Sequence, residues 1–381
     1  MSKVHYLANK YIDNVQLKVF NLIFFGLVVL ISEDSLSQEN INWYDASELL
    51  IQGQLHTTGI DPFHRLPDRM QAKTREALWL LSKNSAGLYL DFKTDAEEID
   101  IQYQVEAKLN FPHMPTTGVS GLDLYAQDKG RWEWVRGNYD FNDTITYRFI
   151  GIKPLAKGER TFRLYLPLYN TLKWLNIGIS KNTSLKSIKP SKKKAVVIYG
   201  TSIVQGACAS RPGMAWPTIL GRKLDRPIIN FGFSGNGRLE PEIIEMVTKN
   251  EAWVFVLDCM ANFTSGQGLG FKEAESRIIK SVMTIRKAHP NTPILLVEHA
   301  GYSDGKMQLG RQTIYTELNA ATQRAYQNLL AQKMNQIYVL KKDSINLDKD
   351  SFVDGTHPND YGMMRYAEAM AKMIEQIENL R

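Results

Sequence analysis

Apolar and polar residues alternate along short segments between Trp43 and about residue 179. The alternation is clearest in residues 86–92, 98–105, 121–125 and 160–166. A period of two is the pattern of strands that bury one face against a core. Many short strands with few helical patterns predict an all-β sandwich of the jelly-roll kind. One short helix is predicted over residues 68–81.

A polar, basic segment separates this region from the rest of the chain. Residues 181–194 contain Pro190 and end in three consecutive lysines, a composition typical of a linker between domains. We therefore place a sandwich domain over residues 38–180 and a second domain over residues 195–381. Two domains suit a chain of 381 residues, because single cores rarely grow beyond about 250–300 residues.

The second domain shows continuous apolar runs separated by amphipathic stretches. The runs occupy residues 195–199, 227–231, 253–257, 294–297 and 337–340. The helical stretches occupy residues 214–224, 241–249, 272–288, 311–334 and 361–377. Strands that are apolar on both faces belong to a buried parallel sheet. The alternation predicts a doubly wound α/β domain, whose functional residues gather at the carboxyl ends of the strands.

The N-terminus carries an apolar stretch from Val19 to Ile31, preceded by three lysines. It is shorter than the about 20 apolar residues that a membrane-spanning helix needs. Ser35 and Ser37 are small residues at the spacing that a signal peptidase uses. We expect residues 1–37 to be an export signal, so that the mature protein is periplasmic or secreted and has no stable membrane span. An uncleaved N-terminal anchor is the alternative interpretation.

Composition and charge add few constraints. Hydrophobic residues make up 44% of the chain, charged residues 23%, and the net charge is +6. The basic residues are dispersed except at 192–194, and no nucleic-acid-binding motif is present, so no nucleic-acid partner is predicted. The seven histidines lack metal-ligand spacing, so neither a metal nor another cofactor is expected. For Cys208 and Cys259, a disulfide and two buried thiols both stay open.

Polar residues and glycines follow the first three predicted strands of the second domain. Ser202 comes directly after the first strand, Gly235 lies in the loop after the second, and Asn262 stands just past the third. Each alone is ordinary, since a serine caps helices and an asparagine closes turns. The glycine order, Gly-x-x-Gly-x-Gly, argues against a dinucleotide-binding loop. Val204 takes the last position of Gly-x-Ser-x-Gly, so the sharp nucleophile elbow is not indicated.

Near the C-terminus, Asp354 and His357 lie three residues apart, with Gly355 between them. One tight turn can place the carboxylate against one ring nitrogen and leave the other nitrogen free to face Ser202. The carboxylate would then fix the tautomer and stabilise the imidazolium. We therefore predict a catalytic triad of Ser202, His357 and Asp354.

The four loops together resemble the SGNH, or GDSL-like, hydrolases, which are named for Ser, Gly, Asn and His in four sequence blocks. These correspond here to Ser202, Gly235, Asn262 and His357. The first block reads Gly-Thr-Ser-Ile in place of Gly-Asp-Ser-Leu. The resemblance implies that the backbone N–H groups of Ser202 and Gly235 and the side chain of Asn262 form the oxyanion hole.

The first domain also resembles a known module. Residues 121–125 read GLDLY, and the neighbouring FPHMPTTG and the later ASRPGM are similar to the same subgroup of esterases. This is the GxDLY module that precedes some SGNH esterases. The resemblance covers residues 43–375 and implies a flavodoxin-like parallel-sheet domain preceded by an all-β sandwich.

The resemblance implies ester hydrolysis through an acyl-enzyme. Export and the attached sandwich favour an acetyl ester on a sugar or polysaccharide, although a small-molecule ester is also compatible. His113, on a Pro-flanked sandwich loop, and Glu298, after the fourth strand, are candidate substrate-lining residues. Acyl transfer to an alcohol and glycan binding without turnover are the alternatives. A lipase is less favoured, because no long apolar lid lies between Asn262 and Glu298. The oligomeric state is not predicted.

Overall fold

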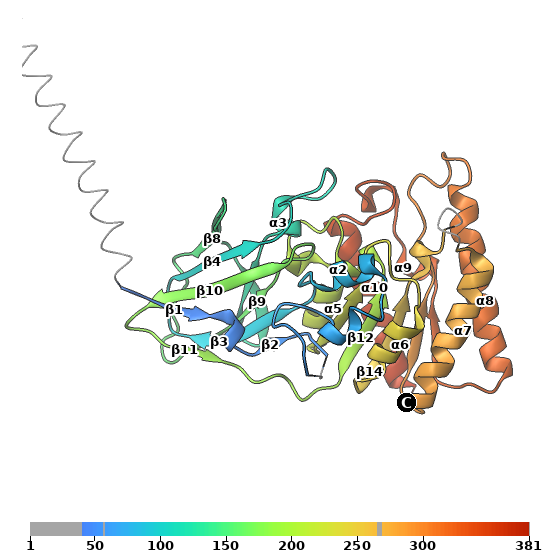
Figure 1. Cartoon of the computed structure of the whole chain (residues 1–381), viewed down its shortest axis with the longest axis horizontal. Helices are drawn as coiled ribbons and strands as arrows, with labels where there is room; N and C mark the ends of the chain where they lie inside the picture. Colours follow the sequence, from blue (N-terminus) through green and yellow to red (C-terminus); the bar gives the residue numbers. More distant parts are fainter. Residues whose placement is uncertain (1–39, 56–57, 265–268, 381) are drawn as a thin grey trace, which may run out of the picture.

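The computed structural model describes residues 40–55, 58–264 and 269–380. An antiparallel β-sandwich comes first, and an α/β part with a parallel sheet follows it (Figure 1). The predicted fold class is confirmed. The export signal predicted over residues 1–37 lies outside the described residues. Among the described helices, none has both the length and the apolar character that crossing a membrane requires.

The sandwich consists of two antiparallel sheets. The first has the order β1 (Ile41–Asp45), β10 (Leu172–Ser180), β4 (Ile99–Val105), β8 (Ile145–Phe149) and β7 (Asn138–Phe141). The second has the order β11 (Leu185–Ser187), β3 (Tyr89–Thr94), β9 (Arg160–Tyr165), β5 (Asp123–Asp128) and β6 (Arg131–Val135), and β2 (Ile51–Gln52) pairs with β3. The inward-facing residues of both sheets form one core, in which Phe92 lies opposite Phe162 with their rings 5.6 Å apart.

Part of the segment predicted as a linker is a strand. β11 pairs antiparallel with β3, so that Ser187 lies opposite Phe92 and Leu185 opposite Thr94. β11 has only three residues, of which Leu185 packs against the sandwich core, and the lysines at 189 and 192–194 lie outside it. Composition alone therefore did not separate an edge strand from a linker.

The α/β part contains a parallel sheet in the order β13 (Ile228–Gly232), β12 (Ala195–Gly200), β14 (Ala252–Asp258), β15 (Ile294–Val297) and β16 (Ile337–Leu340). Numbered from its own first strand, this order is 2-1-3-4-5, the flavodoxin-like arrangement. In such a sheet, ligands bind beyond the carboxyl ends of the strands where the order reverses. Here that point lies between β12 and β14.

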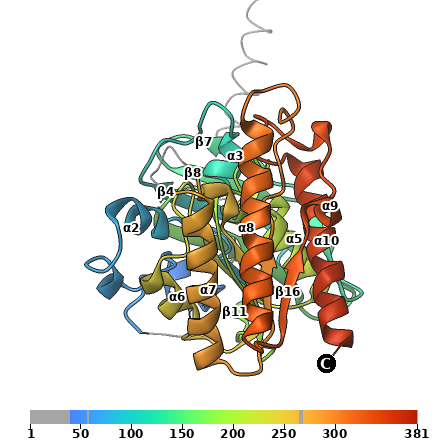
Figure 2. The ribbon, with the colours of Figure 1, turned by 90° about the vertical axis from the view of Figure 1, so that its right-hand side faces the viewer.

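Helices cover both faces of this sheet. α6 (Pro241–Val247), α7 (Phe271–Ala288) and α8 (Arg311–Ala331) pack with Val197 and Tyr199 of β12. α5 (Trp216–Leu224) and α10 (Asp360–Asn379) pack with Val196 and Ile198 on the opposite face. Figure 2 shows α7 and α8 side by side. Burial of alternate residues on two helical layers explains why β12 reads as a continuous apolar run.

Short helices complete the structure. They are α2 (Glu76–Ser82), α3 (Thr116–Val119), α4 (Ser202–Gln205), α9 (Lys342–Ile345) and the 3₁₀ turns η1 (Ala46–Glu48), η2 (Asp68–Met70), η3 (Pro212–Met214), η4 (Met260–Asn262) and η6 (Lys349–Ser351). The single helix predicted over residues 68–81 is in fact η2 followed by α2. Several of these short elements stand at the carboxyl edge of the parallel sheet and carry the candidate site.

The GLDLY segment joins the sandwich to the α/β part. The buried carboxylate of Asp123 accepts hydrogen bonds from the guanidinium of Arg211 and from the backbone N–H of Gly213, the latter at 2.9 Å. Arg211 also donates to the hydroxyl of Tyr125, at 2.7 Å. A Cβ at Gly213 would lie 2.4 Å from the Asp123 carboxylate, so this joint requires glycine. The segment thus ties β5 to the loop that follows the candidate nucleophile.

Candidate active site

Ser202 lies where β12 turns into α4. The turn is so tight that a Cβ at Gly200 would lie 2.1 Å from a methyl group of Val204. The hydroxyl of Thr201 caps α4 by accepting from the N–H of Ile203 at 3.3 Å. Ser202 is the first residue of the helix, so its backbone N–H has no partner within α4. The strand end therefore presents both a hydroxyl and an N–H group at the carboxyl edge of the sheet.

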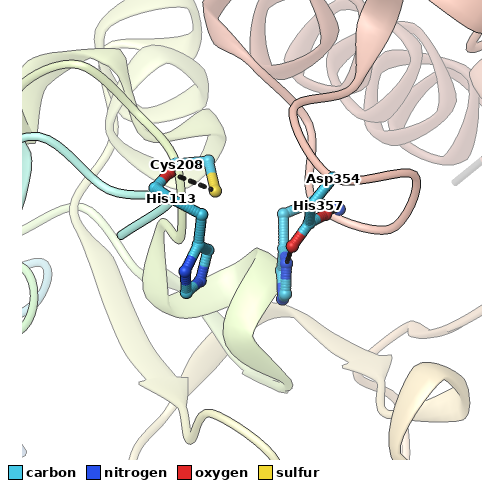
Figure 3. A group of neighbouring side chains, drawn as sticks. All are labelled: His113, Cys208, Asp354 and His357. Atoms are coloured by element: carbon cyan, nitrogen blue, oxygen red, sulfur yellow. Dashed lines mark hydrogen bonds and ion pairs between the residues drawn. The ribbon is translucent and has the colours of Figure 1, made fainter. Parts of the chain in front are cut away.

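The three residues of the predicted triad lie in hydrogen-bond contact. Ser202 Oγ is 2.9 Å from His357 Nε2, and His357 Nδ1 is 2.7 Å from Asp354 Oδ2. Figure 3 shows the carboxylate of Asp354 against the ring of His357. Gly355 has a φ of +81°, which lets the intervening residues make the tight turn. This is the geometry that a nucleophile, a base and a group that orients the base require.

The Asp354 carboxylate is stabilised in its charged form. Partial burial raises its pKa, but hydrogen bonds from the His357 ring and from the backbone N–H groups of His357 and Thr356 outweigh burial and lower the pKa below the ordinary value. Those N–H groups donate to Oδ1 at 2.8 and 3.0 Å. Asp354 is therefore ionised at neutral pH and can stabilise a protonated His357.

The loop after β13 brings Gly235 to the same edge. Gly235 has a φ of +67°, and no heavy atom lies within 4 Å of the position that its Cβ would occupy. The loop packs directly on the nucleophile strand, since a Cβ at Gly237 would lie 1.9 Å from the carbonyl oxygen of Gly200. In the described part of the chain, no hydrogen bond is donated by the backbone N–H of Gly235 or of Ser202. Both groups are thus available as donors.

Asn262 ends η4, directly after β14, and its side chain is buried. The oxygen and nitrogen of an amide are assigned from their hydrogen-bond partners. In the orientation that satisfies them, Oδ1 accepts from the N–H groups of Asn236 and Gly237, both at 3.0 Å. The NH₂ group then faces away from these two donors, on the side where acceptors lie.

Gln205 links the nucleophile helix to its surroundings, a role that the sequence analysis missed. Its side-chain NH₂ donates to Asn84 Oδ1 and to the carbonyl of Leu168, both at 3.1 Å. Its side-chain oxygen accepts from the N–H of Ser234 at 3.0 Å. Gln205 thereby connects α4 to the sandwich side and to the Gly235 loop. In the sequence, the feature that could have indicated this role is that a polar residue directly follows the apolar residues 203 and 204.

Arg65, ahead of α2, is buried and reaches the end of β13. Its guanidinium donates to the carbonyls of Gly232 and Leu81, both at 2.6 Å. It also donates to the carbonyls of Asn84 and Asn230, at 2.8 and 3.3 Å. Burial lowers its pKa to about 9, so the group is still charged at neutral pH. Arg65 holds the strand end from which the Gly235 loop departs.

A sandwich loop places His113 beside His357. The two ring centroids lie 5.7 Å apart, and the carbonyl of His113 accepts from the thiol of Cys208 at 3.3 Å. The loop is held against the α/β part, because Thr117 Oγ1 donates to the carbonyl of Ser210 at 2.6 Å. A Cβ at Gly118 would lie 2.2 Å from the carbonyl oxygen of residue 209. The sandwich therefore contributes a side chain to the candidate site.

The two cysteines are free and buried. Burial raises the pKa of the Cys208 thiol to about 12. The thiol of Cys259 donates to the carbonyl of Tyr199 at 3.5 Å. Of the two alternatives left open by the sequence, the structure shows buried thiols.

Glu298 is held by two helices. One carboxylate oxygen accepts from the side chain of Gln323 on α8 at 2.7 Å. The other accepts from the backbone N–H of Lys342, at the start of α9, at 2.8 Å. These bonds tie the end of β15 to α8 and α9, and the substrate-lining role of Glu298 stays a prediction.

Asp258, at the end of β14, is a buried carboxyl group that the proposed triad does not use. The hydroxyl of Tyr366 donates to its Oδ2 at 2.7 Å. Burial raises its pKa from 3.8 to about 7, and the hydrogen bond from Tyr366 opposes this rise. Its charge therefore costs folding free energy at alkaline pH.

Replacing Asp258 by asparagine is expected to stabilise the protein at pH 8. Because the folded-state pKa exceeds the unfolded-state pKa, wild type loses stability as the pH rises from about 4 to 7. The neutral amide avoids this loss, which amounts to at most roughly 4 kcal/mol for a three-unit shift. Urea unfolding at pH 4 and pH 8 measures the difference in unfolding free energy between the variant and wild type. Asp343→Asn, at an exposed aspartate, is the control. An equal effect of Asp258→Asn at both pH values would contradict the prediction.

Comparison with known proteins agrees with this geometry. Residues 193–375 match the GDSL-like lipase/acylhydrolase family, and residues 41–185 match the GxDLY family, the N-terminus of SGNH-hydrolase-type esterases. A crystal structure described as that of a GDSL-like lipase from Bacteroides ovatus is 33% identical, with a TM-score of 0.82 over 89% of this chain and 98% of that one. The chain therefore belongs to the GDSL-like, or SGNH, hydrolase family.

More distant structures share the fold over 89% of this chain and 98% of their own. The salicylyl-acyltransferase SsfX3 from a tetracycline biosynthetic pathway is 17% identical, with a TM-score of 0.72. A family two carbohydrate esterase from Cellvibrio japonicus is 11% identical, with a TM-score of 0.58. None of the curated proteins compared with the chain matches it. The family supports an acyl ester hydrolase.

Proposed function

We propose that the protein is an exported serine esterase that removes acyl groups, acetyl foremost, from carbohydrate esters. The observation that carries the proposal is the continuous line of contacts from Ser202 Oγ through His357 to Asp354, at 2.9 and 2.7 Å. Such a line activates a serine hydroxyl at neutral pH. The export part rests on the N-terminal sequence, and the mass of the mature N-terminus in secreted or periplasmic fractions tests it.

In the first half-reaction, the Ser202 oxygen attacks the ester carbonyl carbon while His357 Nε2 takes the hydroxyl proton. The carbonyl oxygen becomes an oxyanion, which the N–H groups of Ser202 and Gly235 and the NH₂ group of Asn262 would hold. The bond to the alcohol oxygen then breaks, and His357 returns its proton to that oxygen. In the second half-reaction, His357 deprotonates a water molecule that attacks the acyl carbon. The bond to Ser202 Oγ then breaks, His357 returns the proton to Oγ, and the acid is released.

The comparisons support the proposed acyl donor and suggest two acyl acceptors. Carbohydrate esterases share the fold, among them the enzyme from Cellvibrio japonicus and an acetyl xylan esterase from Butyrivibrio proteoclasticus with a TM-score of 0.51. These names favour an acetylated sugar as substrate. The acyltransferase SsfX3 shares it too, so an alcohol in place of water is the second candidate acceptor.

His113 is proposed to contact the alcohol part of the substrate. It is exposed, and its ring lies 5.7 Å from the ring of His357. His357 must return a proton to the leaving alcohol oxygen, so the neighbouring imidazole lies where a sugar hydroxyl can reach it. The His113→Ala variant is therefore included in the substrate panel below. A larger loss of kcat/KM on sugar acetates than on aryl acetates would support this contact.

A panel of esters tests the proposed function. Acetylated mono- and oligosaccharides and aryl esters of increasing acyl length are incubated with the purified protein, and the released acid is measured. We expect acetyl sugars to have the highest kcat/KM. Product analysis in the presence of alcohol acceptors distinguishes hydrolysis from transfer, because transfer yields a new ester. Absence of turnover on every ester would overturn the esterase and favour a glycan-binding protein.

Asn262→Ala is expected to lower kcat by about 10²–10³-fold, or roughly 2.7–4 kcal/mol, because one oxyanion donor is lost. Asn262→Asp is the informative partner variant. Its carboxylate still accepts from the N–H groups of residues 236 and 237, but it has no N–H to donate. Both variants should therefore be impaired, with KM little changed. A wild-type kcat in Asn262→Asp would remove Asn262 from the oxyanion hole.

A further inference from the structure

Four side chains with metal-ligating atoms converge beside the candidate triad. They are His113 from the sandwich loop, Cys208 from the turn after α4, and Asp354 and His357 from the C-terminal loop. One ligand atom from each lies within 4.8 Å of the ligand atoms of the others. Figure 3 shows the thiol of Cys208 above the gap between the two imidazole rings. Three distant segments of the chain thus supply two imidazoles, a thiol and a carboxylate.

We propose that this cluster binds Zn²⁺ and that the bound cation inhibits the enzyme. Imidazole nitrogen, thiolate sulfur and carboxylate oxygen are the ligands that Zn²⁺ takes in proteins, usually four of them in a tetrahedron. A set of two nitrogens, one sulfur and one oxygen also discriminates against Mg²⁺ and Ca²⁺, which prefer oxygen ligands alone.

The observed spacing is close to that of a tetrahedral site. With metal–nitrogen bonds of about 2.0–2.1 Å and metal–sulfur bonds of about 2.3 Å, ligand atoms are roughly 3.3–3.7 Å apart. The atoms here lie within 4.8 Å of one another, so the most distant of them must approach by up to about 1 Å. The exposed side chain of His113 can rotate to do so, whereas Nδ1 of His357 and Oδ2 of Asp354, now 2.7 Å apart, must exchange their hydrogen bond for bonds to the metal.

The backbone at Cys208 is a second observation. Its φ is +66°, in the left-handed region that residues other than glycine seldom adopt, and such outliers cluster at functional sites. The turn is fixed because the N–H groups of Gly206 and Ala207 both donate to the carbonyl of Ser202, at 2.9 Å. The strained turn directs the thiol to the His113 loop, where it bonds the His113 carbonyl.

Metal binding would inhibit ester hydrolysis because His357, the proposed base, is one of the ligands; this part of the inference rests on the proposed function. The metal would take the lone pair of one ring nitrogen of His357. Binding at Nε2 removes the base from Ser202, and binding at Nδ1 breaks the hydrogen bond to Asp354 and leaves the ring proton on Nε2. The thiol of Cys208 loses its proton to solvent as the sulfur–metal bond forms. In either case, His357 can no longer accept the proton of Ser202.

The test uses the full chain without bound metal and has a readout independent of turnover. Co²⁺ is titrated in as a spectroscopic substitute for Zn²⁺, and a thiolate-to-cobalt charge-transfer band in the near ultraviolet reports the Cys208–metal bond. Cys208→Ser should abolish the band, and His113→Ala should weaken Co²⁺ binding by about tenfold or more. Cys259→Ser is the matched control, since Cys259 is also a free buried thiol but lies outside the cluster.

The inhibition arm measures aryl acetate hydrolysis against ZnCl₂ concentration, with reversal by a chelator. We expect Cys208→Ser to require about tenfold or more Zn²⁺ for half-inhibition, and Cys259→Ser to behave as wild type. A cobalt band that persists in Cys208→Ser, or equal Zn²⁺ sensitivity of both variants, would overturn the proposal. If the protein hydrolyses no ester but the band appears and depends on Cys208, the metal site stands and the proposed function fails.

Discussion

Replacing Ser202 by alanine is expected to lower kcat for ester hydrolysis by roughly 10⁴–10⁶-fold. In the proposed mechanism, the substitution removes the oxygen that forms the acyl-enzyme, so no covalent intermediate can form. The residual rate over water comes from the oxyanion donors and substrate binding, which the substitution leaves in place. The effect on folding should be small, because alanine fits the space of a buried serine and Ser202 Oγ bonds only to a half-buried histidine among the described residues.

Two measurements check this result. Steady-state kinetics on an acetyl ester gives the fall in kcat, and a fluorophosphonate probe should label wild type but not Ser202→Ala. Ser281→Ala, at a buried serine of α7, controls for the loss of a buried hydroxyl and should keep both activity and labelling. A Ser202→Ala protein that retains activity within tenfold of wild type would exclude Ser202 as the nucleophile.

Arg65→Met is expected to lower the free energy of unfolding by about 3–5 kcal/mol, because several buried carbonyl groups lose their donor. The guanidinium donates to four carbonyls, those of Leu81, Asn84, Asn230 and Gly232. Methionine fills a similar volume but donates no hydrogen bond. Each buried carbonyl left without another donor then costs about 1–3 kcal/mol. We also expect kcat to fall, because the end of β13 positions the Gly235 loop.

Urea unfolding of wild type and variants measures the stability change. Arg65→Lys should recover part of it, since an ammonium group carries the charge but cannot fork toward four acceptors. Arg131→Met, at an exposed arginine of β6, should change the unfolding free energy by less than about 0.5 kcal/mol. If Arg65→Met and Arg131→Met have the same urea midpoint of unfolding, the buried guanidinium contributes no net stability.

The elements and the nucleophile were accessible from the sequence because they depend on local periodicity and on topology. Alternation with period two marked β4 and β9, and continuous apolar runs marked β12 and β14. Parallel strands place their carboxyl ends at one edge, so Ser202 and Asn262 could be expected there before any coordinate was known. Asp354 and His357 are neighbours within one turn, and their contact required no knowledge of the rest of the fold.

Other features depend on pairing between segments that are far apart in the chain. β11 was taken for linker, because a strand of three residues with one apolar side chain is too short to show an alternating pattern. Gln205 and Arg65 were missed for a related reason: a buried polar group is explained by its partners, and those partners come from distant segments. The distances between residues in space cannot be obtained from spacing along the chain when loops of unknown path connect them.

By itself, the sequence determined the two kinds of fold and the residues at the strand ends. Alternation with a period of two indicates strands buried on one face, as in the sandwich, and continuous apolar runs indicate strands buried on both faces, as in the parallel sheet. The tertiary structure decided how the sandwich meets the α/β part. Cys208 bonds His113 across 95 residues, and Thr117 bonds Ser210 across 93. These contacts bring a histidine and a thiol to His357. No local pattern predicts them, because they form between the surfaces of two parts of the chain that are far apart in the sequence.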